Sequence, residues 1–215
     1  ISISQKKSIP TVIMTFDPHP KIILNKTDKN YSFLQSIDDK SEFLRKMGID
    51  YLFIVPFDNK ISQLSATNFL KNYIIYPFNP TDIVIGHDHC FGKGKLGDSI
   101  FLKNNEYLYN YSLHIIGTIF KQHERISSTN IRGFINNGEI EKANKYLGRD
   151  YELNGIVHKG KGVGYTIGYP TINIKPHYSE KVIPYNGVYC VDVIINDKTY
   201  LGMCNIGNRP TFYIN

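Results

Sequence analysis

The segment TVIMTFDPHP at residues 11–20 decides the fold of the first part of the chain. Its first six residues form a β-branched and aromatic run, which is typical of a buried strand. The two prolines that follow favour a rigid turn and discourage helix. Similar runs follow at residues 51–55 (YLFIV), 82–85 (DIVI) and 114–119 (HIIGTI). Each is bounded by Pro, Gly, Asn or Asp, so we predict buried strands at all of these positions.

Helical patterns lie between the predicted strands. Residues 37–48 place apolar side chains at helical spacing before a glycine, and residues 65–76 begin with Ser65 as the expected N-cap. Strands that alternate with helices pair in parallel, so we predict an α/β fold with a doubly wound parallel sheet. Short helices are also predicted at residues 129–137 and 139–147, with Gly148 as the stop signal.

The pattern changes near residue 149. Short alternating segments follow at residues 151–158, 171–174, 187–195 and 199–205, with glycines and prolines between them and no amphipathic helix. This pattern predicts antiparallel β-structure, which we expect to form a barrel. The expected domains are therefore residues 1–148 and 149–215.

Composition limits the classes of protein. The chain has 215 residues, of which 41% are hydrophobic and 20% charged, and no run approaches the roughly 20 apolar residues of a membrane helix. The opening ISISQKKSIP lacks the apolar region of a signal peptide. Cys90, Cys190 and Cys204 cannot form a disulfide framework. We expect a cytoplasmic protein that does not associate with membranes.

The net charge of +6 first suggests a nucleic-acid partner. The basic residues are scattered, however, and no Lys/Arg block is present. We therefore favour a nucleotide or phosphate ligand and expect no nucleic-acid partner, with an RNA-binding module as an alternative.

Polar clusters follow the predicted strands, at the edge where ligands bind in open α/β sheets. Asp17 and His19 follow the first strand, although a rigid turn is the simpler interpretation by itself. The stretch GHDHCFGKGKLGD at residues 86–98 follows the third. Its backbone amides could approach a phosphate, with Lys93 and Lys95 adding charge; the alternative is a flexible loop. Zinc at His87, His89 and Cys90 is disfavoured, because no second ligand pair is suitably spaced.

A third cluster, ISSTNIR at residues 126–132, opens a predicted helix after the fourth strand. Ser127, Ser128 or Thr129 would cap that helix, whose N-terminal N–H groups and dipole form an anion site. Arg132 lies within one turn and can donate to a phosphate. The alternative is an ordinary cap beside a surface arginine.

The second domain contains the glycine-rich stretch GKGVGYTIGYPTIN at residues 160–173. Backbone amides around Gly160, Gly162 and Gly168 could wrap phosphates. Thr171 and Asn173, two apart on a predicted strand, would face the same side and could hold a Mg²⁺ that bridges ATP phosphates. The alternative is a hairpin with a mobile glycine loop.

Together these segments resemble the prokaryotic bifunctional riboflavin kinase/FAD synthetase family. TFDPHP at 15–20, IGHDHCFGKGKLGD at 85–98 and ISSTNIR at 126–132 resemble its adenylyltransferase module. GKGVGYTIGYPTINI at 160–174, NGVY at 186–189 and GMCNIGNRPTF at 202–212 resemble its riboflavin kinase module. The resemblance covers nearly the whole chain, in the family's order.

The resemblance implies a transferase that phosphorylates riboflavin to FMN and adenylylates FMN to FAD, with ATP, riboflavin, FMN and FAD as its partners and Mg²⁺ as cofactor. It assigns catalytic roles to Arg132 and Ser128 and places Asp17, His19 and Phe91 at the flavin. The residues assigned to nucleotide binding are Ser127, Ser128, Thr129, Arg132, Asp88, Gly160, Gly162, Gly168, Thr171 and Asn173, and the last two also hold the metal.

The sequence departs from the family pattern in three places. His89 stands where the family usually has an aromatic residue. The family begins with a mid-sheet strand carrying a His-x-Gly-His signature, and its kinase uses a later Glu as general base; neither is found between Ile1 and Asn215. We therefore expect a chain truncated at both ends that makes little FMN or FAD by itself. The alternative is a fragment that binds nucleotide or flavin without turnover.

Overall fold

The computed structural model describes residues 1–24, 32–122, 124–159, 168 and 171–207. These residues form two compact units. The first unit contains the chain up to Arg125 except the stretch Ser32–Ser36, and the second contains that stretch and the residues from Ile126 onward. No described helix is both long and apolar enough to span a membrane.

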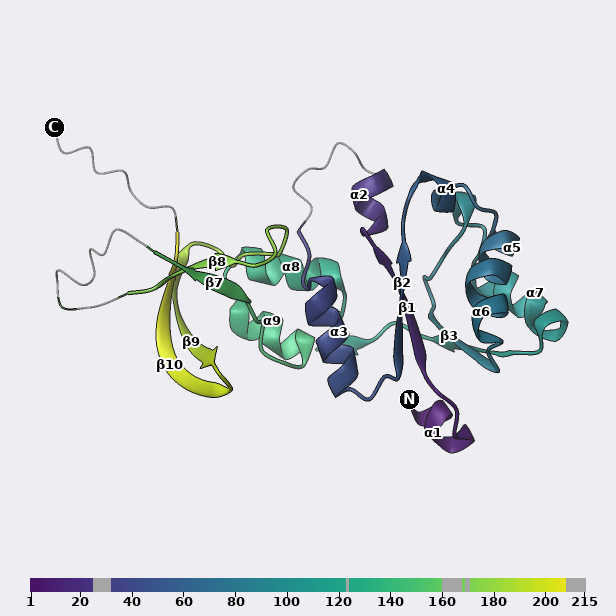
Figure 1. The fold of residues 1–215 in the computed structure, drawn as a ribbon, viewed down its shortest axis with the longest axis horizontal. Helices are drawn as coiled ribbons and strands as arrows, with labels where there is room; N and C mark the ends of the chain where they lie inside the picture. The colour runs from purple at the N-terminus through teal and green to yellow at the C-terminus, as the bar shows by residue number, and fades with distance from the viewer. Residues whose placement is uncertain (25–31, 123, 160–167, 169–170, 208–215) are drawn as a thin grey trace. The chain divides into compact units, whose positions relative to one another are not determined.

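The first unit is built on parallel strands (Figure 1). Strand β1 (Val12–Asp17) pairs in parallel with β2 (Tyr51–Pro56), and β3 (Asp82–Gly86) pairs in parallel with β4 (Ser112–Ile116). The predicted parallel pairing is therefore confirmed. The described strands form separate pairs, however, because no strand hydrogen bonds link β1 or β2 to β3 or β4.

Helices cover both faces of the β1–β2 pair (Figure 1). Met14 and Phe16 contact a hydrophobic cluster on one side, while Thr15, on the opposite face of the strand, contacts helix α3 (Ile37–Lys46). The cluster side holds a nearly continuous helical stretch that comprises α5 (Ala66–Phe69), the π-helical η1 (Leu70–Ile75) and α6 (Tyr76–Phe78). Ser65 caps this stretch as predicted, since its side chain accepts a hydrogen bond from Asn68 N.

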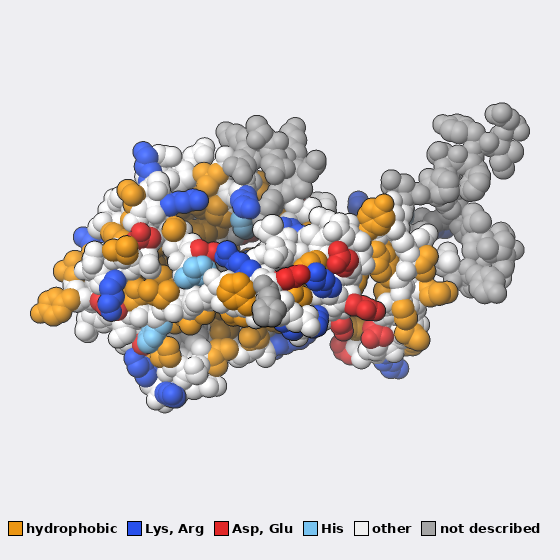
Figure 2. Space-filling model, turned by 180° about the vertical axis from the view of Figure 1, so that it is seen from behind, with side chains coloured by type: hydrophobic (Ala, Val, Ile, Leu, Met, Phe, Trp, Pro, Cys, Tyr) orange, Lys and Arg blue, Asp and Glu red, His pale blue; other side chains and the backbone are white. Residues whose placement is uncertain are grey.

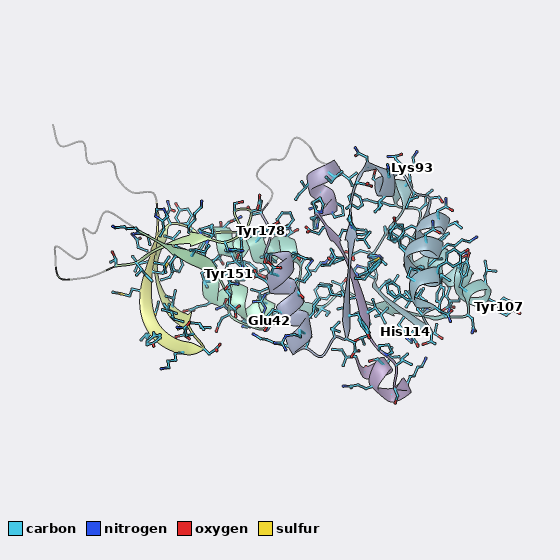
Figure 3. The ribbon with its side chains drawn as sticks, viewed as in Figure 1. Glu42, Lys93, Tyr107, His114, Tyr151 and Tyr178 are labelled. Atoms are coloured by element: carbon cyan, nitrogen blue, oxygen red, sulfur yellow. The ribbon has the colours of Figure 1, made fainter. Side chains whose placement is uncertain are left out.

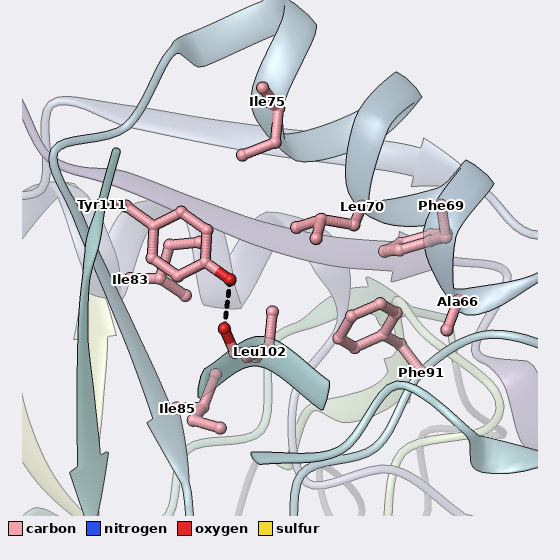
Figure 4. Close-up of a cluster of buried hydrophobic side chains, with 9 residues drawn as sticks. All are labelled: Ala66, Phe69, Leu70, Ile75, Ile83, Ile85, Phe91, Leu102 and Tyr111. Carbon is pink, nitrogen blue, oxygen red and sulfur yellow. Dashed lines mark hydrogen bonds between the residues drawn. The ribbon is translucent and has the colours of Figure 1, made fainter. Parts of the chain in front are cut away.

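The core of the first unit lies between this helical stretch, β3 and helix α7 (Ser99–Tyr109), which no sequence pattern had predicted (Figure 4). Leu70 and Leu102 are almost completely buried there. The Tyr111 hydroxyl donates to the Leu102 carbonyl at 2.6 Å, and burial raises the pKa of this tyrosine to about 12. The hydrogen bond allows the phenol to sit among apolar side chains.

Short elements complete the first unit. The helices are α1 (Ser2–Lys7), α2 (Pro20–Leu24), α4 (Asn59–Ser62) and the 3₁₀ turn η2 (Lys93–Lys95), and strands β5 (Phe120–Lys121) and β6 (Glu124–Arg125) form a small antiparallel pair.

The second unit combines two helices with antiparallel strands (Figure 1). Helix α8 (Ser128–Asn136) and helix α9 (Ile140–Leu147) pack through Ile131, Ile135, Ala143 and Tyr146, which are buried in one cluster. Strand β7 (Gly155–His158) pairs with β8 (Asn173–Pro176), and β9 (Gly187–Ile195) forms a hairpin with β10 (Lys198–Ile206). These antiparallel pairs are separate in the described residues, and they do not show a closed barrel.

The stretch Ser32–Ser36 joins the second unit through its backbone. Phe33 N donates to Glu180 O at 2.7 Å, and Val182 N donates to Phe33 O at 2.9 Å. Tyr178 packs against the Phe33 ring, and the Tyr151 hydroxyl donates to Val182 O at 2.6 Å (Figure 3). These hydrogen bonds join residues that are nearly 150 positions apart in sequence. Residues 32–36 therefore belong to the second unit, whereas the residues from Ile37 to Arg125 belong to the first.

The basic side chains are dispersed. On the face drawn in Figure 2, Lys and Arg side chains lie among acidic and hydrophobic ones, without gathering into one continuous stripe. The described salt bridges also mix the two signs locally, as in Arg45–Glu42 and Lys103–Glu106.

Candidate functional site

The first candidate cluster lies at the carboxyl end of β1. Asp17 ends the strand, is exposed, and precedes Pro18 with a cis peptide bond. The prediction that the two prolines form a rigid turn and discourage helix does not hold at Pro20, which is the first residue of α2. The first position of a helix tolerates proline, because its N–H would have no partner within the helix.

His19 is oriented by the start of α2. Its Nδ1 accepts a hydrogen bond from Lys21 N at 3.2 Å, so the neutral ring carries its proton on Nε2. The carbonyl of the same residue accepts from Ile22 N at 2.9 Å. The ring is thereby fixed beside the end of β1, where Asp17 is exposed.

The loop after β3 is a closed structure. Phe91 and Gly97 exchange backbone hydrogen bonds of 3.0 and 2.9 Å, and Lys93 N donates to Leu64 O at 2.7 Å. Lys95 N and His89 N likewise donate to loop carbonyls. These N–H groups are committed within the protein. The Lys93 side chain, labelled in Figure 3, and the Lys95 side chain are exposed and could contact a phosphate.

Phe91 lies in the core of the first unit. It is 7% exposed and packs against Phe69 at a centroid distance of 5.2 Å, and Phe69 in turn contacts Phe16 of β1 at 6.0 Å. The structure therefore joins the end of β1 and the loop after β3 through a row of aromatic rings. The assignment of Phe91 to a flavin stays a prediction.

Asp88 is paired with a residue that sequence reasoning missed. Arg125 Nη2 donates to Asp88 Oδ2 at 2.5 Å, and this hydrogen bond lowers the pKa of the carboxyl. Arg125 belongs to β6, 37 residues away in sequence. Its one sequence signal is its position directly before ISSTNIR, and that position does not reveal its partner.

The N-terminus of α8 has the geometry of an anion site. Ser127 is the N-cap, and its hydroxyl accepts from Asn130 N at 3.2 Å. Within the described part of the chain, no residue accepts from the N–H groups of Ser128 and Thr129. Arg132 reaches back to the same turn, with Nη2 donating to Thr129 Oγ1 at 3.3 Å. Two N–H donors and a guanidinium therefore converge at a positive helix end.

The predicted kinase residues are only partly described. Gly160 and Gly162 lie outside the described residues, whereas Gly168 has a φ of +78° and is exposed. Asn173 is the first residue of β8, opposite His158, but Thr171 precedes the strand. The prediction that both residues lie on one strand is wrong, because the ladder with β7 begins only at Asn173.

The donor chemistry of Thr171 and Asn173 fits Mg²⁺ delivered with ATP. Both residues are exposed and offer neutral oxygens, and a Mg²⁺ ion commonly takes few protein ligands and completes its coordination with phosphates and water. No group of three or more His, Cys, Asp or Glu side chains among the described residues could hold a metal ion. Among these described residues, His87, His89 and Cys90 of the loop after β3 form no such group.

The predicted site residues divide between the two units. Asp17, His19, Asp88 and Phe91 belong to the first unit, whereas the residues from Ser127 onward belong to the second.

Two family models match successive parts of the chain. The model for FAD synthetase matches residues 1–130, and the model for riboflavin kinase matches residues 147–215. The chain belongs to the bifunctional riboflavin kinase/FMN adenylyltransferase family. The family resemblance inferred from the sequence motifs is therefore confirmed.

Curated members of this family align over nearly the whole chain. The bifunctional riboflavin kinase/FMN adenylyltransferase of Listeria monocytogenes is 36% identical over 213 residues, covering 98% of this chain and 66% of that protein. The protein of the same name from Buchnera aphidicola subsp. Schizaphis graminum is 36% identical, with coverage of 98% and 67%, and that of Escherichia coli K12 is 32% identical, with coverage of 96% and 66%. The chain thus spans about two thirds of the length of these relatives.

A solved structure shares the fold. The crystal structure titled as a macrolide-efflux protein from Streptococcus pneumoniae has a TM-score of 0.88 and 32% sequence identity to this chain. The match covers 98% of this chain and 68% of that one.

Proposed function

We propose that the protein makes FMN and FAD from riboflavin and ATP. In the first reaction, the riboflavin 5′-hydroxyl oxygen bonds to the γ-phosphorus of ATP, its proton goes to a base, and ADP leaves. In the second, a phosphate oxygen of FMN bonds to the α-phosphorus of another ATP, and pyrophosphate leaves. The observation that carries this proposal is the succession of FAD synthetase and riboflavin kinase matches along one chain.

For adenylyl transfer, we assign the ATP phosphates to the N-terminus of α8. The N–H groups of Ser128 and Thr129 would donate to phosphate oxygens, and Ser127 would keep the turn in shape as its cap. Arg132 would stabilise the charge that develops on the leaving pyrophosphate, and Ser128 would contact the same group. Asp88 would contact the nucleotide, and Asp17, His19 and Phe91 would shape the flavin pocket.

For phosphoryl transfer, we assign ATP and Mg²⁺ to the glycine-rich stretch of the second domain. Thr171 and Asn173 would place the metal, and Gly160, Gly162 and Gly168 would allow the backbone to approach the phosphates. A bound Mg²⁺ would neutralise phosphate charge. We further propose that the kinase domain extends from residue 149 and closes into a β-barrel, and that the first domain, residues 1–148, forms one doubly wound sheet.

The test is product analysis on protein expressed from its complete gene. The protein is incubated with riboflavin, ATP and Mg²⁺, or with FMN, ATP and Mg²⁺, and the flavins are separated by chromatography. We expect FMN and FAD in the first mixture, FAD in the second, and neither product when EDTA replaces Mg²⁺. Saturable binding of ATP and flavin with no product would instead support the alternative, a binding protein without turnover.

A further inference from the structure

Lys40 is a partly buried cation that faces the carboxyl end of β1. Its Nζ donates to Thr15 Oγ1 at 2.9 Å in a partly buried contact. Thr15 and Asp17 share one face of the strand, because side chains two apart point the same way. Helix α3 therefore brings an ammonium group to the strand end that carries Asp17 and His19.

The surroundings of Lys40 leave its charge incompletely compensated. Thr15, its hydrogen-bond acceptor, is neutral, and no carboxylate of the described residues lies within 4 Å of the ammonium group. Burial lowers the pKa of Lys40, and the nearby charge of Asp17 partly opposes this shift. A lysine ammonium has three N–H donors, so an anion could still accept from this group.

The other cations of α3 are arranged differently. Arg45 and Lys46 are exposed and pair with Glu42, which Figure 3 labels on the same helix, at 2.9 and 3.5 Å. These charges lie in water and are compensated locally. Lys40 differs from them in its burial, in its contact with β1 and in having no carboxylate partner among the residues that the structure describes.

We propose that Lys40 binds a phosphate group of the substrate in the adenylyltransferase site. Ligands of open α/β sheets bind beyond the carboxyl ends of the strands, and Thr15 lies two residues, or about 7 Å, before the end of β1. A lysine side chain held at Thr15 can therefore reach a ligand bound there. The phosphate belongs either to ATP or to FMN, and the assignment rests on the proposed adenylyl transfer.

Variants in the protein expressed from its complete gene test this proposal. Lys40→Met keeps the length of the side chain but removes the charge, and Lys40→Arg keeps the charge. We expect Lys40→Met to lower kcat/KM for FAD formation by roughly 10- to 100-fold, because a charge-assisted hydrogen bond is lost. Lys40→Arg should recover part of that loss. The matched control Lys46→Met, in the same helix, should stay within about twofold of wild type.

Separate titrations identify the phosphate. A raised KM for FMN alone would assign Lys40 to the FMN phosphate, and a raised KM for ATP alone to the ATP phosphates. Riboflavin phosphorylation should stay within about twofold, and it reports whether the variant is folded. FAD formation by Lys40→Met within about twofold of wild type would overturn the proposal.

Equilibrium binding separates this proposal from the proposed function. The dissociation constants of ATP and of FMN are measured calorimetrically on wild type and Lys40→Met, without turnover. If wild type bound both ligands but made no FAD, adenylyl transfer would be refuted. The dissociation constants of wild type and Lys40→Met would still show whether Lys40 binds a phosphate. If Lys40→Met bound both ligands as tightly as wild type, Lys40 would have no role at the phosphate.

Discussion

At the scale of single residues, Arg132 is the clearest test of the proposed anion site on α8. Arg132→Ala leaves the capped helix in place, since Ser127 and the buried Ile131 and Ile135 hold it. We expect FAD formation from FMN to fall by about 10²- to 10³-fold, because charge on the leaving group loses its stabilising donor. Riboflavin phosphorylation should change less than about twofold. Both rates are measured by chromatography, with Arg149→Ala as control, since this partly buried arginine lies outside α8.

Asp82 makes the first unit sensitive to acid. It accepts hydrogen bonds from Lys7 Nζ at 2.6 Å and from His114 Nε2 at 2.9 Å when that nitrogen is protonated, and its side chain is only 8% exposed (Figure 3). The hydrogen bond from Lys7, followed by those from His114 and Thr81, lowers the pKa of Asp82 well below its ordinary value. The ionised form therefore favours folding. This contribution is complete above the ordinary aspartate pKa of about 4 and is lost as the pH falls below it.

The matching experiment compares urea unfolding at pH 7 and pH 3. Asp82→Asn should lower the free energy of unfolding by on the order of 1 kcal/mol at pH 7, because Lys7 is half exposed and its pair with Asp82 is partly screened. The variant should also lose less stability between pH 7 and pH 3 than wild type does. Asp192→Asn, at an exposed strand position, serves as control. An equal acid loss in wild type and Asp82→Asn would contradict the role of Asp82.

At the scale of elements, the loop after β3 depends on Gly92. This residue has a φ of +71°, and a Cβ built there would lie 2.7 Å from the Ala66 Cα, a backbone atom of α5. Gly92→Ala should therefore lower the free energy of unfolding by more than about 2 kcal/mol, since both the backbone conformation and the close approach are disfavoured. Urea denaturation measures this change.

Gly48→Ala measures how much an alanine at a positive φ lowers the free energy of unfolding when no close contact is involved. Gly48 follows α3 with a φ of +79°, and nothing lies within 4 Å of the position that a Cβ would occupy there. We expect a loss of about 1 kcal/mol at this residue. Equal losses at the two glycines would show that contact with α5 contributes nothing.

At the scale of the whole molecule, the two proposed reactions should be separable. Thr171→Ala removes a hydroxyl assigned to Mg²⁺ and ATP of the kinase and leaves α8 untouched. We expect FMN formation from riboflavin to fall at least 100-fold, with FAD formation from added FMN within about twofold of wild type. Both products are quantified in parallel reactions. An equal fall in both activities would mean that Thr171 acts on the whole fold or on a shared site.

Sequence patterns predicted those elements whose signals are local. Ser65 caps its helix as predicted, and Ser127, one of three predicted candidates, caps α8. Strand β9 has the predicted bounds, and β1 lies within one residue of its predicted bounds. A cap or a strand depends on residues within a few positions of one another, so the sequence displays the cause directly. The ISSTNIR segment is a candidate anion site for the same reason, because its cap residues and Arg132 lie within one turn of one another.

By itself, then, the sequence determined the parallel strands of the first unit, the cap of the helical stretch at Ser65 and the family to which the chain belongs. Tertiary structure alone decided that Arg125 pairs with Asp88, that Phe91 enters the core, and that Lys40 reaches Thr15. These contacts join residues that are far apart in sequence or whose neighbours supply no periodic signal. The energies of these contacts depend on how deeply each side chain is buried and on which groups the folded chain brings within hydrogen-bond distance. A local sequence pattern shows neither the burial nor the partners.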